Sequence, residues 1–273
     1  MTVFAELSYG DEKKTYSTKG HPLGTRGVLP DGRVFRFSLN GGTAREAGLL
    51  MQAGVQPFDG EWDMDVAVES THSAGSPNIG SKDIPLLATG TLTSALLVDH
   101  YQDGLMYVND GPGEGHVYHV SSHPALSSDG GSTVLVVHLG GDDEIVSTAL
   151  STLSLVGLIV NEYSLPVPTD IDTTLTRVLG VMPAAVAADQ YFWLQTYGPA
   201  AVSIADNPAV PVVGRNVVPN ISTSDEAGSV VSESTAFTSD ANEPDRDVPV
   251  IGYAMGVAAA ATDKGLIFLT ISP

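Results

Sequence analysis

The chain has 273 residues and no cysteine, and its 32 acidic residues against 12 basic ones give a net charge of −20 at pH 7. The length allows one large domain or two small ones, and the lack of cysteine excludes disulfide bonds, thiol catalysis and thiolate metal sites. An acidic surface repels the nucleic acid backbone, so we expect no nucleic acid partner. No stretch holds the roughly 20 apolar residues that span a bilayer, so we expect no membrane partner. The N-terminus also lacks the pattern of a signal peptide.

The basic residues are concentrated near the N-terminus. Seven of the twelve lie in the first 45 positions, together with four acidic residues, so that segment carries +3 and the remainder −23. Between Lys82 and Arg177 there is no lysine or arginine. Acidic charge keeps a chain soluble whatever its function. The sharper interpretation is that the N-terminal segment docks on an acidic surface while the rest of the chain faces solvent.

In chain order, residues 1–58 are rich in glycine and poor in strand patterns, which predicts an extended N-terminal arm. Two stretches fit a helix, 43–54 and 143–154, although the second also fits a loop followed by a strand. Elsewhere, short runs rich in valine, isoleucine, threonine and tyrosine recur between turn residues, as is typical of β-strands. These runs lie at 33–39, 86–97, 105–109, 116–122, 133–139, 176–182, 190–198, 201–205, 210–219, 248–260 and 265–272.

The pattern as a whole predicts an all-β fold of sandwich-like or barrel-like blocks with little helix. We expect the arm at 1–58, a first β-rich block at 59–165 and a second at 166–273. The second block either stands apart from the first or shares one core with it. It contains a polar, acidic stretch at 221–247, which favours an exposed loop.

The stretch GLMYVNDGPGEGHVYHVSSH, residues 104–123, has glycines like those of a nucleotide-binding loop and histidines like those of a metal site. A dinucleotide fingerprint needs its glycines between a strand and a helix, whereas strand-like alternation flanks them on both sides here. The glycines therefore predict a hairpin turn, where glycine adopts positive φ at low steric cost. His116 and His119 would point to opposite faces of a strand, so we expect no metal site.

Acidic pairs could carry chemistry. Asp63 and Asp65, like Asp170 and Asp172, would share one face of a strand, a spacing compatible with calcium or with a glycosidase. A chain with 32 acidic residues produces such pairs by chance, and no catalytic or nucleotide-binding motif accompanies them. We therefore expect no enzyme, no catalytic residue and no cofactor.

An aromatic run, QYFWLQTYG at 190–198, alternates like a strand that ends at Gly198-Pro199. Such a strand lies either in the centre of a core or between subunits, where tryptophan and tyrosine are enriched. For this reason Trp193 is a candidate interface residue. Arg26, Arg33 and Arg36 of the basic segment are the other candidates.

Four stretches resemble virion structural proteins of tailed bacteriophages, especially marine ones, in the same order along the chain. They are GHPLGTRGVLPDGRVFRFSLNGGTAREAGLLMQAG (20–54), DGLMYVNDGPGEGHVYHVSSH (103–123), GVMPAAVAADQYFWLQTYGPAAV (180–202) and IGYAMGVAAAATDKGLIFLTIS (251–272). Among such proteins the chain looks most like a head decoration, or cement, protein. The resemblance implies a structural protein, often a homotrimer, that binds the outside of an assembled capsid. There it would contact the major capsid protein at subunit junctions and stabilise the shell.

On this interpretation the chain is made in the host cytoplasm and lies on the outer surface of the virion capsid. Arg26, Arg33, Arg36 and Trp193 would contact the capsid or a second subunit. Deleting residues 1–45 should then release the protein from the capsid and leave the rest folded. Two alternatives stay open: a tail, neck or head-fibre component that recognises host-surface glycans, and an enzyme that acts on polysaccharide.

Overall fold

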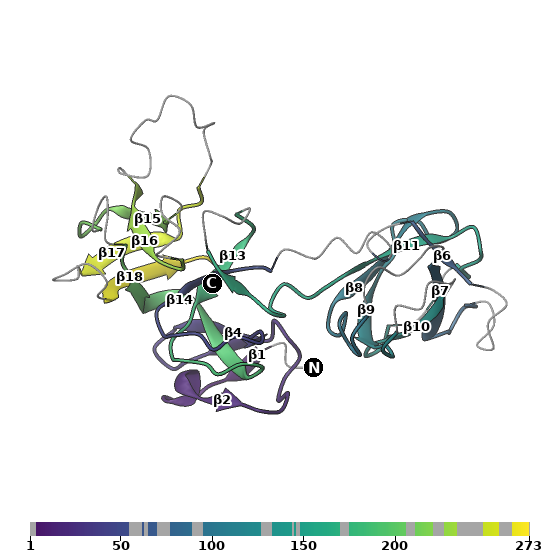
Figure 1. Cartoon of the computed structure of the whole chain (residues 1–273), viewed down its shortest axis with the longest axis horizontal. Coiled ribbons are helices and arrows are strands. Elements are labelled where there is room, and N and C mark those ends of the chain that lie inside the picture. The colour runs from purple at the N-terminus through teal and green to yellow at the C-terminus, as the bar shows by residue number, and fades with distance from the viewer. Residues whose placement is uncertain are drawn as a thin grey trace, which may run out of the picture. The chain divides into compact units, whose positions relative to one another are not determined.

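The computed structural model describes residues 4–54, 62, 65–69, 77–88, 95–126, 133–143, 145, 148–169, 175–205, 211–220, 227–233, 248–256 and 264–272. Strands dominate this part of the chain (Figure 1), so the predicted all-β class is confirmed. No helix within it is long and apolar enough to cross a membrane. The chain divides into two compact units: unit 1 comprises residues 1–55 and 162–273, and unit 2 comprises residues 56–161.

Unit 2 is a closed six-stranded antiparallel β-barrel with the strand order β10-β7-β6-β11-β8-β9. Its strands are β6 (Val66–Val68), β7 (Asp83–Ala88), β8 (Leu105–Asp110), β9 (Val117–Ser122), β10 (Thr133–Leu139) and β11 (Leu155–Ile159). Along β10, Leu135, Val137 and Leu139 are buried, and the residues between them are partly exposed. This alternation is the two-residue period of a strand with one face on a core. One hydrophobic core, which includes Trp62, occupies the barrel.

The glycine-rich stretch of unit 2 is a hairpin turn, as predicted. Leu105 to Tyr107 of β8 pair with His119 to Val117 of β9 in antiparallel register. Gly111, Gly113 and Gly115 between the two strands all have positive φ. A Cβ on Gly111 would overlap the carbonyl oxygen of Leu153. These glycines therefore allow the turn and its close packing.

Unit 1 is a twelve-stranded sheet with the main order β1-β3-β4-β14-β18-β17-β15-β16. Strands β2 and β13 pair with β14, β13 also pairs with β5, and β5 pairs with β12. The strands are β1 (Phe4–Glu6), β2 (Thr15–Tyr16), β3 (Arg26–Val28), β4 (Val34–Leu39), β5 (Leu50–Gln52), β12 (Val167–Pro168), β13 (Val178–Val181), β14 (Tyr191–Ser203), β15 (Asn216–Pro219), β16 (Val230–Ser232), β17 (Gly252–Gly256) and β18 (Lys264–Thr270). A short 3-10 helix, η1 (Asp11–Lys13), lies between β1 and β2 along the chain.

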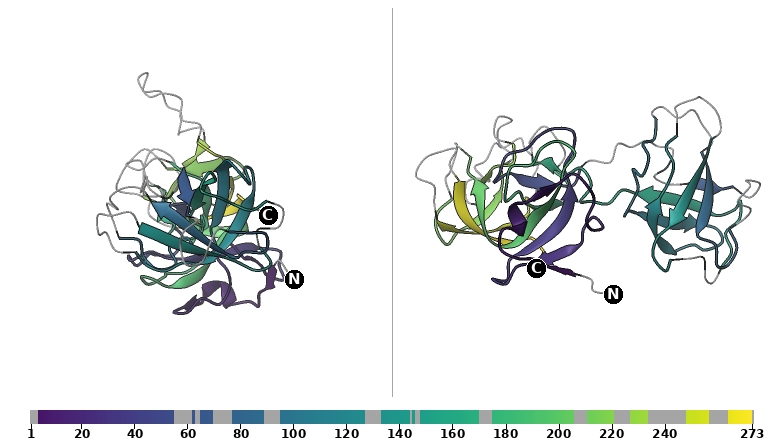
Figure 2. Two further views of the ribbon diagram at one scale, coloured as in Figure 1. Left: turned by 90° about the vertical axis from the view of Figure 1, so that its right-hand side faces the viewer. Right: turned by 90° about the horizontal axis from the view of Figure 1, so that it is seen from below.

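The predicted N-terminal arm is wrong, because residues 4–54 are part of this sheet. Strand β4 pairs with the first half of β14, and β18 pairs with the second half; the purple, green and yellow strands in Figures 1 and 2 show this order. Phe35, Phe37 and Trp193 form a core with Leu7 and Leu29. Removing residues 1–45 would take away β4 and open this core. The expectation that the rest of the chain would stay folded therefore no longer holds.

Two further predictions are wrong. Residues 43–54 form no helix, because Gly48 has a φ of 83° and the segment continues into β5. For 143–154 a helix and a loop followed by a strand were both open; its described residues contain no helix, and β11 begins at Leu155. Strand β14 does not end at Gly198-Pro199 but continues to Ser203. Pairing with β4 stops at Tyr197, so the missing N–H of Pro199 interrupts no ladder with that strand.

Unit 2 is inserted between two paired strands of unit 1. The chain leaves unit 1 after β5 and returns at β12, and Val167 of β12 lies opposite Gln52 of β5. The hydrophobic core of unit 2 contains residues of unit 2 alone, and the four cores of unit 1 contain residues of unit 1 alone. Each unit therefore has its own source of stability.

Replacing Phe37 with alanine should lower the free energy of unfolding of unit 1 by about 3–5 kcal/mol, because a fully buried ring is lost from its core. Each unit has one tryptophan, Trp193 in unit 1 and Trp62 in unit 2, and each is 1% exposed. In the W62F variant the fluorescence of Trp193 follows the urea unfolding of unit 1, and in the W193F variant the fluorescence of Trp62 follows that of unit 2. Phe37→Ala should shift the Trp193 transition alone. Phe4→Ala, at a ring 43% exposed, should shift neither, and a shift of both by Phe37→Ala would contradict independent cores.

Candidate functional site

Unit 1 exposes an apolar surface on one face of β14, β18 and β17. Pro199, Phe268 and Tyr253 lie side by side across the three strands, and Ala201 and Leu266 form the next row. The residues that alternate with them on β17 and β18 are buried. Leu266, Tyr253 and Met255 are 44%, 41% and 40% exposed. We refer to this surface as the apolar face, made of Tyr197, Pro199, Ala201, Tyr253, Met255, Leu266 and Phe268.

The aromatic side chains of the apolar face hold one another in place. The ring of Phe268 stacks on Tyr253 with a centroid distance of 5.2 Å and an interplanar angle of 8°. It meets Tyr197 edge-on, at 5.3 Å and 83°. Such ring pairs contribute about 0.5–1.5 kcal/mol beyond the area that they bury. The surface is therefore ordered before any partner arrives, and exposed apolar surfaces of this kind mark interaction sites.

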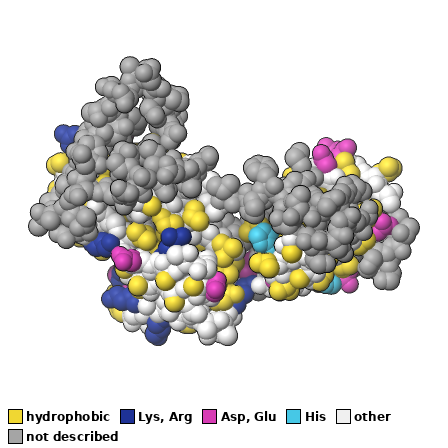
Figure 3. Space-filling view, in the orientation of Figure 1, with side chains coloured by type: hydrophobic (Ala, Val, Ile, Leu, Met, Phe, Trp, Pro, Cys, Tyr) yellow, Lys and Arg dark blue, Asp and Glu magenta, His cyan; other side chains and the backbone are white. Residues whose placement is uncertain are grey.

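Two cationic side chains stand beside the apolar face. Lys264 begins β18, and its Nζ donates a hydrogen bond to Ser203 Oγ at 2.7 Å. Arg33 precedes β4, and its Nε donates to Asp31 Oδ2 at 2.9 Å. Lysine and arginine side chains are visible over unit 1 in the face drawn in Figure 3. Apolar surface with arginine and lysine at its margin is suited to a protein partner, because the margin of an interface is polar.

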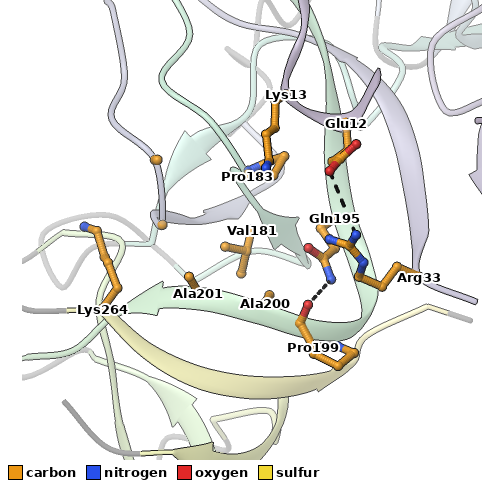
Figure 4. Close-up of a pocket in the computed structure, with 12 residues that line it drawn as sticks. Glu12, Lys13, Arg33, Val181, Pro183, Gln195, Pro199, Ala200, Ala201 and Lys264 are labelled. Carbon is orange, nitrogen blue, oxygen red and sulfur yellow. Dashed lines mark hydrogen bonds and ion pairs between the residues drawn. The ribbon is translucent and has the colours of Figure 1, made fainter. Parts of the chain in front are cut away.

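A pocket of about 190 Å³ lies next to the apolar face (Figure 4). Lys13, Arg33 and Lys264 stand around it, and Pro199 and Ala201 belong to both surfaces. The remaining lining residues are Glu12, Ala47, Gly48, Val181, Pro183, Gln195 and Ala200. The pocket therefore combines charged side chains from η1, from the turn before β4 and from β18.

Of the four predicted contact residues, the structure brings Arg33 alone to this surface. Trp193 is 1% exposed and packs on Phe37, so its strand is a core strand and the ring is not available to a partner. Arg26 lies opposite Arg36 across β3 and β4. Arg36 is partly buried, and its guanidinium donates to Gly24 O and to Ser272 Oγ, both at 3.2 Å. Arg36 thus ties the last residues of the chain to β4.

The residues of the apolar face were not singled out from the sequence. GLIFLTIS has four consecutive apolar side chains, so the run does not show which face of the strand is exposed. In the structure, Leu266 and Phe268 alternate with the buried Ile267 and Leu269. The signal for the apolar face that the sequence offered was a strand with apolar residues on both faces, in a chain with few aromatic residues.

The histidines that the sequence analysis considered as metal ligands do not form a metal site within the described residues. His123 is 2% exposed; its Nε2 accepts the N–H of Tyr101 at 3.0 Å, and its Nδ1 lies 2.8 Å from the carbonyl oxygen of Pro124. His116 Nδ1 lies 3.0 Å from the Tyr118 hydroxyl, and His119 is exposed. Within the described ranges, no group of three or more histidine, aspartate or glutamate side chains is placed to hold a metal ion.

The acidic pairs lie mostly outside the described residues, which exclude Asp63, Asp170 and Asp172. Asp65 accepts a hydrogen bond from Asn109 Nδ2 at 2.5 Å.

Comparison of the chain with protein-family models, curated proteins and solved structures finds no match. The apolar face and the pocket beside it are therefore the features from which a function can be argued.

Burial lowers the pKa of His123 below its usual value of 6.5. The unfolded chain then binds a proton that folded unit 2 does not, so the stability of unit 2 falls as the pH drops below 6.5, until the folded pKa is passed. We expect His123→Gln to reduce the loss of Trp62-reported stability between about pH 7 and pH 5. His119→Gln, at an exposed site in the same barrel, should keep the wild-type loss. Equal losses in His123→Gln and wild type would contradict this assignment.

Proposed function

We propose that this chain is a structural virion protein that binds the outside of an assembled phage capsid through unit 1 and stabilises the shell, as decoration proteins do. The apolar face is the observation that carries the proposal, because an exposed, ordered set of aromatic and aliphatic side chains with cations at its margin is suited to a protein partner. Two of the four stretches that resemble virion structural proteins of tailed phages, 180–202 and 251–272, contain β17, β18 and all of β14 except Ser203.

The charges of the two units support unit 1 as the attached part. Unit 1 carries eleven of the twelve lysine and arginine residues, whereas unit 2 has fourteen acidic residues against Lys82 alone. Unit 2 therefore has a net charge of −13, which repels other acidic surfaces and favours contact with solvent. The partner implied is the major capsid protein, and self-association as a homotrimer on the capsid surface is part of the same proposal. The proposal requires no catalytic residue and no cofactor.

A second candidate is a tail, neck or head-fibre component that recognises host-surface glycans. The stacked pair of Tyr253 and Phe268 favours it, because Tyr253 is 41% exposed and offers an aromatic surface. Trp193 is buried and offers no such surface. The two candidates differ in how many copies one particle needs.

Quantitative mass spectrometry of purified particles tests the choice by measuring the copy number of this chain. A decoration protein is expected at a number comparable to that of the main shell protein. A handful of copies per particle would favour the tail, neck or fibre candidate. Absence from the particle would overturn both.

Leu266→Asp should weaken binding to capsids that lack this protein, because it places a charge in the middle of the apolar face. Burying a leucine contributes about 1.5–3 kcal/mol, so the dissociation constant should rise by about 10-fold to 100-fold. Co-sedimentation with purified capsids measures the effect. Leu153→Asp is the matched control, since Leu153 is 74% exposed in unit 2. Wild-type binding by Leu266→Asp, with the Trp193 transition unchanged, would contradict attachment through the apolar face.

A further inference from the structure

The pocket beside the apolar face has a set of charged side chains that apolar contact does not explain. Lys13 comes from η1, Arg33 from the turn before β4, and Lys264 from the start of β18. In Figure 4, Lys13 extends from η1 toward Pro183, while Lys264 and Arg33 stand at opposite ends of the strand segment that carries Ala200 and Ala201. Three separate segments therefore bring cations to one hollow.

Two glycines leave room for the stems of two of these cations. Gly48 has a φ of 83°, and a Cβ there would lie 2.8 Å from both Cδ and Cε of Lys264. Gly198 has a φ of 89°, and a Cβ there would lie 2.9 Å from Cγ of Arg33. Each cationic stem thus crosses a position that a larger residue would occupy.

The charges around the pocket suit a ligand with a single negative charge. Arg33 is already engaged, because its guanidinium bonds Asp31 and lies 3.9 Å from Glu12. Those three groups sum to −1, and the ammonium groups of Lys13 and Lys264 bring the total to +1. Lys264 uses one hydrogen on Ser203, and an ammonium group has three. Donors therefore remain for an incoming anion.

Gln195 adds a hydrogen-bond acceptor. Its side chain is 2% exposed, and its Nε2 donates to Pro199 O at 2.8 Å and to Tyr197 O at 3.2 Å. These two bonds fix the amide so that Oε1 is turned toward the interior of the pocket in Figure 4. An amide N–H of the ligand can donate to this oxygen. The volume of about 190 Å³ is below the roughly 300–1,000 Å³ of sites for larger organic ligands and suits a single side chain.

We propose that this pocket binds the carboxylate of an aspartate or glutamate side chain on the protein to which unit 1 attaches, an inference that rests on the proposed function. Lys13 and Lys264 bind the carboxylate, and Gln195 accepts an N–H from the same segment. Because Pro199 and Ala201 line both the pocket and the apolar face, the acidic residue is flanked by apolar residues in the partner. The pocket then sets the position of the partner, and the apolar face supplies most of the buried area.

The first test uses the full chain without a partner. In an NMR titration, N-acetylglutamate methylamide should shift the side-chain signals of Gln195 and Lys264 to saturation. N-acetylglutamine methylamide, which has no carboxylate, should not. Lys13→Glu/Lys264→Glu should abolish the shifts, whereas Lys14→Glu, next to Lys13 in sequence and paired with Asp11, should keep them. Equal shifts with both compounds, or no saturation with the carboxylate, would overturn the inference.

The second test uses capsids that lack this protein. Lys264→Gln should weaken capsid binding by about tenfold and make it less dependent on salt, and Lys14→Gln should do neither. Trp193 fluorescence checks that both lysine variants are folded. Normal capsid binding by Lys264→Gln, together with loss of binding by Leu266→Asp, would overturn the pocket and leave the proposed function. If the wild-type chain binds the carboxylate compound saturably but does not bind capsids, the proposed function is overturned and carboxylate binding by the pocket remains.

Discussion

The pairing of β14 with two different strands is the constraint on which unit 1 depends. Its first half pairs with β4 from the N-terminal segment, and its second half pairs with β18 from the end of the chain. Trp193 on the first half packs against Phe37, and the second half carries Pro199 and Ala201 to the apolar face. One 13-residue strand thus joins the core to the apolar face. A change that disturbs β4 therefore reaches the surface through the backbone of β14.

The apolar face stays ordered although it is exposed. Its rings are held by one another and by a sheet whose opposite face is buried. The stems of Lys264 and Arg33 pass over Gly48 and Gly198, which leave room for them. Pre-arranged groups spend less entropy on binding. An ordered surface of this kind is compatible with the proposed attachment to a capsid.

Unit 2 is an insertion in the sequence of unit 1. It begins and ends at the paired strands β5 and β12, and its barrel has a core of its own. Closure of the barrel removes exposed strand edges, and its acidic charge discourages association. These properties suit a part that faces solvent while another part attaches. They also explain why single-tryptophan variants can follow the two units separately.

The sequence by itself determined the all-β class, the hairpin turn at the glycine-rich stretch and the uneven distribution of charge, because these depend on local periodicity, on glycine conformation and on composition. Only the tertiary structure decided that residues 4–54 belong to the sheet, since β2, β4 and β5 of that segment pair with strands more than a hundred residues away. It likewise placed Trp193 inside the core and Leu266 outside it. Both lie in apolar strands, and which face of a strand is covered depends on segments remote in the chain. The pocket was beyond sequence reasoning for the same reason, because Lys13, Arg33 and Lys264 belong to segments far apart in the chain that all pack against β14.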